Sequence, residues 1–415
     1  MEKTVYLDNA ATSFPKPESV YVAVDKAMRE ACGNPGRSGH KLSLSAGRIV
    51  DEARMLCARL FNAQSPETII FTNNTTTALN IAIKGFLNSG DHVITSSLEH
   101  NSVSRPLNHM APDGINVTKI PTDLFRGLGA DDIAAAVQPN TKLVVCTHIS
   151  NVTGTVNDIA SIGSYCREKG IAFLVDAAQS AGVKPIDAQQ MKIDMIAFPG
   201  HKGLFGPQGT GGLYIRPGLE LGTIIQGGTG SVSESLRQPE SSPEKYESGT
   251  LNTPGLAGLA AGIRFILETG IEQIDKRETH LVNRLIEGIC AIDSVSIIGP
   301  DAIGQGAVGQ GNIGQGNIGQ CVIEQGIIGP GGAKSRGNVV SVRIESISVP
   351  DAAVIMDTAF NIAVRGGLHC ASDAHRSAGT LETGGTIRIS PNYFNSEADI
   401  DYCLAALESC AKGFV

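Results

Sequence analysis

The chain has 415 residues and a formal net charge of −8; 41% of the residues are hydrophobic and 18% are charged. This length allows two domains, and the acidic balance argues against a nucleic-acid-binding protein, which would carry a basic face. No apolar run approaches the roughly 18 residues of a membrane helix, and the N-terminus lacks the apolar stretch of a signal peptide. Nine cysteines without CxxC pairs indicate buried thiols in a reducing cytoplasm, and neither disulfides nor a zinc site is expected.

Helical spacing of apolar residues alternates with short apolar runs from about residue 16 to 255. The spacing predicts helices over Val20–Ala31 and Ala46–Phe61, and the runs predict strands over Glu67–Thr72, Asp91–Ser96, Lys142–Thr147, Ala172–Val175 and Met195–Ala197. These runs do not alternate with period two, as expected for strands that helices cover on both faces. The pattern therefore predicts an α/β fold with a mainly parallel sheet, whose ligands lie beyond the carboxyl ends of the strands.

A second unit is expected after Gly255. Helices are predicted over Leu256–Thr269 and Ile271–Ile292, followed by strands in SVSIIGP and NVVSVRIESI and a helix near Glu397–Lys412. We therefore expect an N-terminal segment (1–15) near the smaller domain, a large domain (16–255) and a smaller α/β domain (256–415). The smaller domain carries a Gly-rich insertion at 301–337 with two tandem GNIGQ copies. Its composition favours a surface insertion, and a stacked-turn element that docks a partner or borders the site is the alternative.

Two candidate residues with titratable side chains follow apolar strands. Lys202, in FPGHKGLFGPQG, lies in a tight turn, where partial burial would lower its pKa and make it a nucleophile or a base; a solvated turn lysine is the alternative. Asp176 ends FLVD, where a carboxylate needs a cationic partner such as a protonated pyridine nitrogen, although helix capping would also explain it. Gln179 lies one turn further on and would face the same ligand.

Hydroxyls and amides gather at three other strand ends. Thr75 and Thr76, in TNNTTTALN, precede a helix whose first amides suit a phosphate. His100, in SSLEHNS, would stack on an aromatic ring or carry protons, but a lone histidine is more often structural. Asn151, in HISNVTGT, supplies a further amide. We therefore predict that these side chains share one ligand site.

These motifs together resemble a known family of enzymes. The chain resembles fold-type I pyridoxal 5′-phosphate (PLP) enzymes of the class V aminotransferase branch, and within it the cysteine desulfurase and selenocysteine lyase family. The resemblance covers nearly the full length and rests on YLDNAATS, EHNS, HISNVTGT, VDAAQS, GHKG, YESGTLNTPG, RGGLHC and TIRISP. It implies a PLP-binding large domain with a mainly parallel seven-stranded sheet and a smaller C-terminal α/β domain.

The resemblance also implies roles for cofactor-binding residues. Lys202 would hold PLP as a Schiff base and later move the Cα proton of the substrate. Asp176 would pair with the pyridine nitrogen, and His100 would stack on the ring and serve as an acid or base. The remaining contacts would be made to the phenolic oxygen by Asn151 and Gln179, and to the phosphate by Thr75, Thr76 and His201. One departure is Pro199, where relatives commonly have a serine, so the phosphate site lacks one hydroxyl donor.

Further implied roles concern the substrate and a second subunit. Arg388, in TIRISP, would bind the substrate carboxylate together with Asn151. Thr250 would reach the phosphate of the neighbouring subunit, so a homodimer with active sites at the interface is expected. Arg37 and His40, in NPGRSGHKLS, match a segment that borders the active-site entrance in relatives.

Cys370, in RGGLHCAS, matches the loop cysteine that attacks the sulfur of the substrate. Its glycine-rich surroundings, His369 beside it and Arg365 upstream indicate an accessible loop, although a buried inert thiol is the usual alternative. Leu368 replaces the first of two paired histidines that relatives carry. The residues just beyond the loop, His375 and Arg376, are interpreted as solvated turn residues, and the alternative is that they tune the loop.

The sequence thus predicts a cytoplasmic, PLP-dependent cysteine desulfurase that converts L-cysteine to L-alanine and passes the sulfur to a cysteine persulfide. A sulfur-acceptor protein is an expected partner, whereas nucleic acid, membrane and metal are not. The alternatives are a selenocysteine lyase acting on L-selenocysteine, an epimerase or transaminase of the same branch, and a non-catalytic sulfur-relay scaffold. Cys370 discriminates among the enzymes, since an epimerase or transaminase has no need of a loop thiol.

Overall fold

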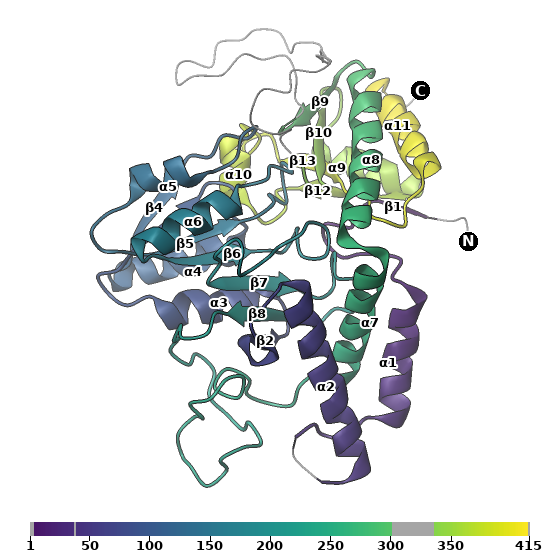
Figure 1. Cartoon of the computed structure of the whole chain (residues 1–415). Helices are drawn as coiled ribbons and strands as arrows, with labels where there is room; N and C mark the ends of the chain where they lie inside the picture. Colours follow the sequence, from purple (N-terminus) through teal and green to yellow (C-terminus); the bar gives the residue numbers. More distant parts are fainter. Residues whose placement is uncertain (1–3, 37–38, 301–335, 414–415) are drawn as a thin grey trace.

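The computed structural model describes residues 4–36, 39–300 and 336–413 (Figure 1). Its helices are α1 (Glu18–Glu30), α2 (Lys41–Leu60), α3 (Thr75–Phe86), α4 (Asn101–Met110), α5 (Ala130–Ala136), α6 (Ile159–Lys169), α7 (Thr253–Thr269), α8 (Ile271–Cys290), α9 (Val349–Thr358), α10 (Ser372–Ser377) and α11 (Glu397–Ala411). Short 3-10 turns span Pro66–Thr68 and Ala111–Asp113. Nearly all of the predicted insertion at 301–337, with both GNIGQ copies, lies outside the described residues, and so does Arg37.

Seven strands form the central sheet in the order β2-β8-β7-β6-β5-β3-β4. They are β2 (Ile69–Thr72), β3 (His92–Ser96), β4 (Asn116–Ile120), β5 (Thr141–Thr147), β6 (Ala172–Asp176), β7 (Met195–Pro199) and β8 (Gly211–Ile215). Strand β8 runs antiparallel to β2 and β7 on its two sides, and the other six strands of this sheet share one direction. The predicted α/β class with a mainly parallel seven-stranded sheet is therefore confirmed, and β4 and β8 are additions to the five strands expected from the sequence.

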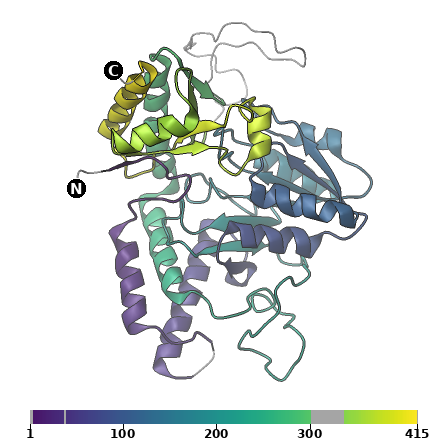
Figure 2. The ribbon, with the colours of Figure 1, turned by 180° about the vertical axis from the view of Figure 1, so that it is seen from behind.

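Helices cover both faces of this sheet, which explains the apolar strand runs. Successive side chains of β5 point to opposite faces: Val144 and Cys146 pack with α2, α6 and α7, whereas Leu143 and Val145 pack with α3 and α4. Helices α5 and α6 lie in front of the sheet in Figure 1, and α3 and α4 are in front in the opposite view of Figure 2. Because both faces of the sheet are buried, side chains that bind a ligand are expected at the ends of the strands.

A second, smaller core surrounds the antiparallel sheet β12-β13-β10-β9. Its strands are β9 (Val295–Ile298), β10 (Val340–Ile344), β12 (Arg365–Gly367) and β13 (Thr386–Ile389), against which α8, α9 and α11 pack. The N-terminal strand β1 (Val5–Tyr6) pairs with β11 (Ile362–Ala363), and Leu7 enters this core. The predicted domain limits stay a prediction, but α7 packs with α1 and α2, which favours a boundary after this helix.

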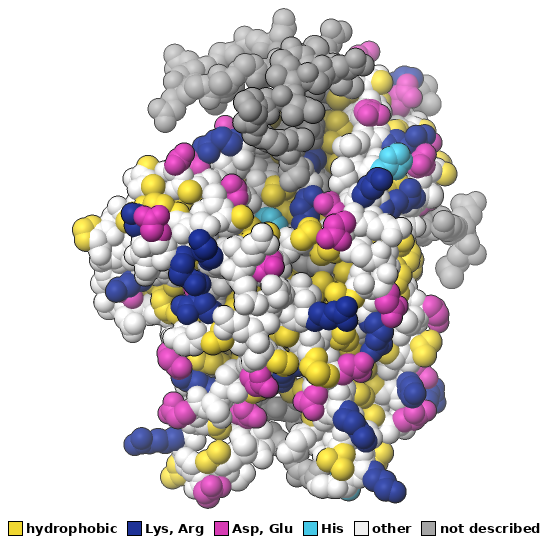
Figure 3. Space-filling view, viewed as in Figure 1, with side chains coloured by type: hydrophobic (Ala, Val, Ile, Leu, Met, Phe, Trp, Pro, Cys, Tyr) yellow, Lys and Arg dark blue, Asp and Glu magenta, His cyan; other side chains and the backbone are white. Residues whose placement is uncertain are grey.

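No helix in the described ranges is both long and apolar enough to cross a membrane. On the described part of the face shown in Figure 3, basic and acidic side chains are interspersed. This view therefore shows no broad surface of one charge.

A buried ion pair fastens the long segment after β8 to the large sheet. Both Nη atoms of Arg54 bind the carboxylate of Glu247, at 2.8 and 2.9 Å, and Glu247 also accepts the Phe71 N–H at 2.6 Å. Removing one partner of a buried pair leaves an uncompensated charge, so Arg54→Ala should lower the free energy of unfolding by about 3–5 kcal/mol. Urea unfolding measures this loss. Arg29→Ala, which breaks an exposed pair with Asp25, is the control, and an equal loss in both variants would contradict the prediction.

Candidate active site

A cavity of about 230 Å³ lies at the carboxyl edge of the large sheet. The ends of β5, β6 and β7 form one wall with the first turn of α3, and residues of β12, β13 and the loop after β12 form another. Nine of the eleven predicted site residues line it: Thr75, Thr76, His100, Asn151, Asp176, Gln179, His201, Lys202 and Arg388. Cys370 and Thr250 are the two that do not. Parallel strands thus bring together side chains that are far apart in the sequence.

Lys202 reaches the cavity from a turn that depends on glycine. A Cβ on Gly200 would overlap the side chain of Thr210, so only glycine allows the turn to lie this close to β8. Loss of hydration, reinforced by the Arg388 guanidinium, lowers the pKa of Lys202 to about 8. A useful fraction of the amine is therefore neutral near neutral pH and can attack a carbonyl or accept a proton.

Asp176 is a buried carboxyl group at the end of β6. Its side chain is only 1% exposed, and its Oδ1 accepts the Ala178 N–H at 2.9 Å. Burial raises its pKa to about 6, although the Ala178 N–H and Lys202 oppose this shift. A buried carboxylate on a cavity wall favours a ligand that brings a positive charge or a strong donor, such as a protonated ring nitrogen.

The part of the cavity at the start of α3 is suited to an anion. Asn74 caps α3 by accepting the Thr77 N–H at 2.9 Å, so the first amides of the helix face this end. Thr75 Oγ1 and His201 Nδ1 are buried without a hydrogen-bond partner among the described residues. Buried polar atoms are normally paired, and helix starts attract anions, so a phosphate group fits here. Pro199 lines the same cavity and contributes no hydroxyl.

His100, Gln179 and Asn151 are each oriented by a hydrogen bond to another residue of the cavity lining. His100 Nδ1 accepts the Ser102 N–H at 3.1 Å and so caps α4, while burial lowers its pKa to about 4. Gln179 Nε2 donates to Ala10 O at 3.1 Å, and Asn151 Nδ2 donates to His369 O at 2.8 Å. The structural role considered for His100 is therefore present, and the same ring also lines the cavity.

Arg388 is held by a carboxylate that sequence reasoning missed. Its Nη2 donates to Asp8 Oδ1 at 2.8 Å and its Nη1 to Asn151 O at 3.2 Å. Arg388 is 1% exposed, and its Nε is buried without a partner among the described residues. This unpaired Nε can donate a hydrogen bond to a carboxylate ligand. The only sequence signal for Asp8 was its place in YLDNAATS, because a pairing so distant along the chain leaves no local pattern.

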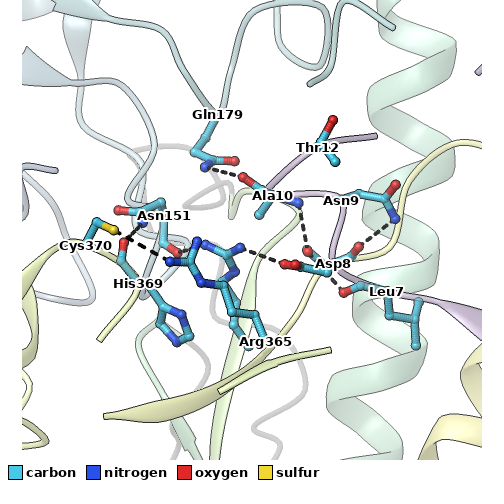
Figure 4. A network of polar contacts seen from close by, with 12 residues as sticks. Leu7, Asp8, Asn9, Ala10, Thr12, Asn151, Gln179, Arg365, His369 and Cys370 are labelled. Carbon is cyan, nitrogen blue, oxygen red and sulfur yellow. Dashed lines mark hydrogen bonds and ion pairs between the residues drawn. The ribbon is translucent and has the colours of Figure 1, made fainter. Parts of the chain in front are cut away.

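Cys370 lies next to the cavity and is exposed. Its Sγ is 3.6 Å from Arg365 Nη2, and its carbonyl oxygen accepts the Asn101 N–H at 2.8 Å (Figure 4). Of the eight cysteines in the described ranges, only Cys32 is also exposed. A thiol beside a guanidinium, open to solvent and close to a ligand cavity, has the surroundings of a reactive cysteine.

Several predicted residues lie elsewhere. Thr250 is exposed and borders a separate pocket of about 100 Å³ between the start of α3 and the segment before α7. His40 caps α2 by accepting the Ser43 N–H at 3.2 Å. The interpretation of His375 as a solvated turn residue is wrong: His375 is fully buried, because Ala374 beside it packs in a cluster with Leu98 and Val152 and its own ring lies next to that of His369. Arg376 is exposed and pairs with Asp373 at 2.7 Å.

An amine, a buried carboxylate and an anion-binding helix start, at the strand ends of a mainly parallel sheet, define a PLP enzyme of fold type I. The family model "Aminotransferase class-V" matches residues 5–328 and 317–403. A probable cysteine desulfurase of Methanothermobacter thermautotrophicus is 35% identical over 98% of this chain and 94% of its own length. The cysteine desulfurase IscS of Vibrio campbellii is 35% identical over 72% of each chain.

Solved structures give the same result. An apo cysteine desulfurase of Thermococcus onnurineus NA1 superposes with a TM-score of 0.86 at 31% identity, covering 99% of this chain and 95% of that one. CsdA of Escherichia coli, also a cysteine desulfurase, gives 0.81 at 26% identity with the same coverage. The chain therefore belongs to the cysteine desulfurase family of class V aminotransferases. The cavity residues fit PLP, the cofactor of this family, and the described residues hold no group of three or more side chains suited to a metal ion.

Proposed function

We propose that this protein is a cysteine desulfurase that converts L-cysteine to L-alanine and keeps the sulfur as a persulfide on Cys370. The observation that carries the proposal is the exposed Cys370 thiol, 3.6 Å from Arg365 and adjacent to the cavity that Lys202 and Arg388 line. The family membership supports the same reaction.

The residues that line the cavity have different roles in this proposal. Bound PLP supplies an electron sink at the substrate Cα. Asp176 would keep the ring nitrogen protonated, Asn151 and Gln179 would bind the phenolic oxygen, His100 would stack on the ring, and Thr75, Thr76 and His201 would hold the phosphate. Arg388 binds the substrate carboxylate through its unpaired Nε, with Asn151 beside it. Lys202 anchors the cofactor and then, as an amine with a lowered pKa, removes the Cα proton.

Cys370 carries the sulfur step. Cys370 loses its proton as its sulfur, 3.6 Å from Arg365 Nη2, attacks the substrate sulfur, and an S–S bond forms as the C–S bond breaks. The bonding electrons stay on the substrate carbon, which takes up a proton, supplied by Lys202 or His100, and leaves as the methyl group of alanine. Two thiols thus yield alanine and one persulfide without an external oxidant. A sulfur-acceptor protein would then accept the outer sulfur.

A homodimer completes the proposed site. Thr250 is exposed and outside its own cavity, which supports a role at the phosphate of a second copy. Exposed apolar side chains on α1 and α2, among them Val22, Met28 and Leu44, give a second copy a surface to bury. All eight cysteines in the described ranges are free thiols, which supports a reducing location such as the cytoplasm.

A product assay tests this function. The holoenzyme is incubated with L-cysteine, with L-selenocysteine, and with L-alanine plus a 2-oxo acid, and alanine, sulfide and selenide are quantified. The proposal expects alanine from L-cysteine in amounts equal to the sulfur released under reducing thiol. Turnover of L-selenocysteine alone would instead indicate a lyase, and amino transfer without sulfur release would indicate a transaminase.

Asp8 gives a prediction about substrate binding. Since its carboxylate orients the Arg388 guanidinium and balances its buried charge, Asp8→Asn should raise KM for L-cysteine roughly tenfold with little change in kcat. Steady-state kinetics measures both constants. Asp275→Asn, which removes a comparable carboxylate paired with Lys184, is the control. A lower KM in Asp8→Asn would show that Asp8 competes with the substrate for Arg388.

A further inference from the structure

The turn that presents Cys370 has an unfavourable backbone. His369 has φ of 49° and Cys370 has φ of 57°, and both carry a Cβ that makes this left-handed region costly. Two adjacent residues of this kind persist only where the surroundings hold them in place. The turn is therefore a place to look for side chains that position the nucleophile.

Two hydrogen bonds hold the turn from the side of the large sheet. Asn151 Nδ2 donates to His369 O at 2.8 Å, and the Asn101 N–H donates to Cys370 O at 2.8 Å. Figure 4 shows Asn151 and Arg365 beside His369 and Cys370. These contacts hold the two carbonyl groups, but neither of them involves the His369 ring.

The His369 ring is buried and its protonation can be assigned. The side chain is 2% exposed, and its Nε2 lies 3.1 Å from Thr386 O and 3.0 Å from Thr386 Oγ1. Because a carbonyl oxygen only accepts, Nε2 carries the hydrogen, and burial keeps the ring neutral by lowering its pKa to about 2. Nδ1 is therefore a bare acceptor, and it is buried without a partner among the described residues.

A second buried histidine offers the missing donor. His375, in α10, is fully buried, and its Nδ1 lies 2.7 Å from Thr380 Oγ1. Its Nε2 is also buried without a partner among the described residues, and its ring centroid is 5.4 Å from that of His369. Two buried nitrogens without hydrogen bonds in neighbouring rings would lower the free energy of unfolding, unless a hydrogen-bonded link joins them.

We propose that His375 is a positioning residue whose Nε2–H is linked to Nδ1 of His369 through one buried water, and so fixes the turn that presents Cys370. The hydrogen bonds then run from Thr380 through both rings to Thr386. The value of this arrangement for turnover rests on the proposed function, because it assumes that Cys370 is the nucleophile. The contact itself does not depend on that assumption.

Three variants of the holoenzyme test the proposal. His375→Phe keeps a ring and removes both nitrogens, whereas His375→Gln can still place an amide N–H near His369. His92→Phe is the matched control, since His92 is equally buried and likewise bonded to threonine hydroxyls, but lies at the start of β3. Amide hydrogen exchange of residues 368–371 reports the turn, and steady-state kinetics with L-cysteine reports its use.

We expect exchange in this turn to be roughly tenfold faster in His375→Phe, with kcat lowered by a similar factor and KM within about twofold. His375→Gln should restore most of the slow exchange and most of kcat, and His92→Phe should change neither the exchange of this turn nor kcat. Unchanged exchange in His375→Phe, or equal effects in all three variants, would overturn the proposal. Faster exchange in a protein without desulfurase activity would uphold the contact and reject the proposed function instead.

Discussion

Replacing Lys202 with alanine is expected to lower L-cysteine desulfuration by roughly 10³-fold or more, because one amine both anchors the cofactor and moves the Cα proton. The variant should also lack the visible absorbance of a lysine-linked cofactor when PLP is added. Absorbance spectra and an alanine assay measure the two losses separately. Both expected losses follow from the position of Lys202. Burial lowers its pKa to about 8, and it lines the same cavity as Asp176.

Lys202→Arg is the matched variant for this test. It keeps a positive charge in the cavity, but a guanidinium stays protonated and is a poor nucleophile. We therefore expect Lys202→Arg to be as inactive as Lys202→Ala. Substantial activity in either variant would contradict the assignment of Lys202.

Replacing Cys370 with alanine is expected to lower sulfur release from L-cysteine by roughly 10²-fold or more while the cofactor spectrum stays unchanged. Alanine also carries a Cβ, so the strain of the left-handed turn is the same and only the sulfur atom is lost. Sulfide and alanine production under physiological thiol concentrations measures the effect.

Cys32→Ala is the control for Cys370→Ala, because Cys32 is the other exposed cysteine in the described ranges. We expect Cys32→Ala to match the wild type. If Cys370→Ala is as fast as the wild type, the persulfide mechanism is wrong.

Much of the large sheet was predictable because its strands are buried on both faces and read as plain apolar runs. Two strands escaped for physical reasons. Strand β4, NVTKI, lies at the sheet edge and is half exposed, so its sequence resembles a loop. Strand β8 begins with Gly211 and Gly212, because a Cβ at these positions would overlap Phe198 of β7 and, at Gly212, also Ile70 of β2, and glycine is not a typical strand residue.

The cavity was predictable to the extent that its residues follow strand ends, since such ends meet at one edge of a parallel sheet. Pairings between distant segments were not. Asp8 holds Arg388 across almost the whole length of the chain, and no local pattern records that contact. His375 lies among small and polar residues typical of a solvated turn, and contacts with distant segments that leave no local pattern bury this part of α10.

Peptide mass spectrometry after a short incubation with L-cysteine, without added reductant, tests the proposed reaction most directly. We predict one added sulfur atom on the peptide that contains Cys370, formed in step with the first equivalent of alanine and absent from the peptide that contains Cys32. Alanine formation that leaves the Cys370 peptide unmodified would contradict the account.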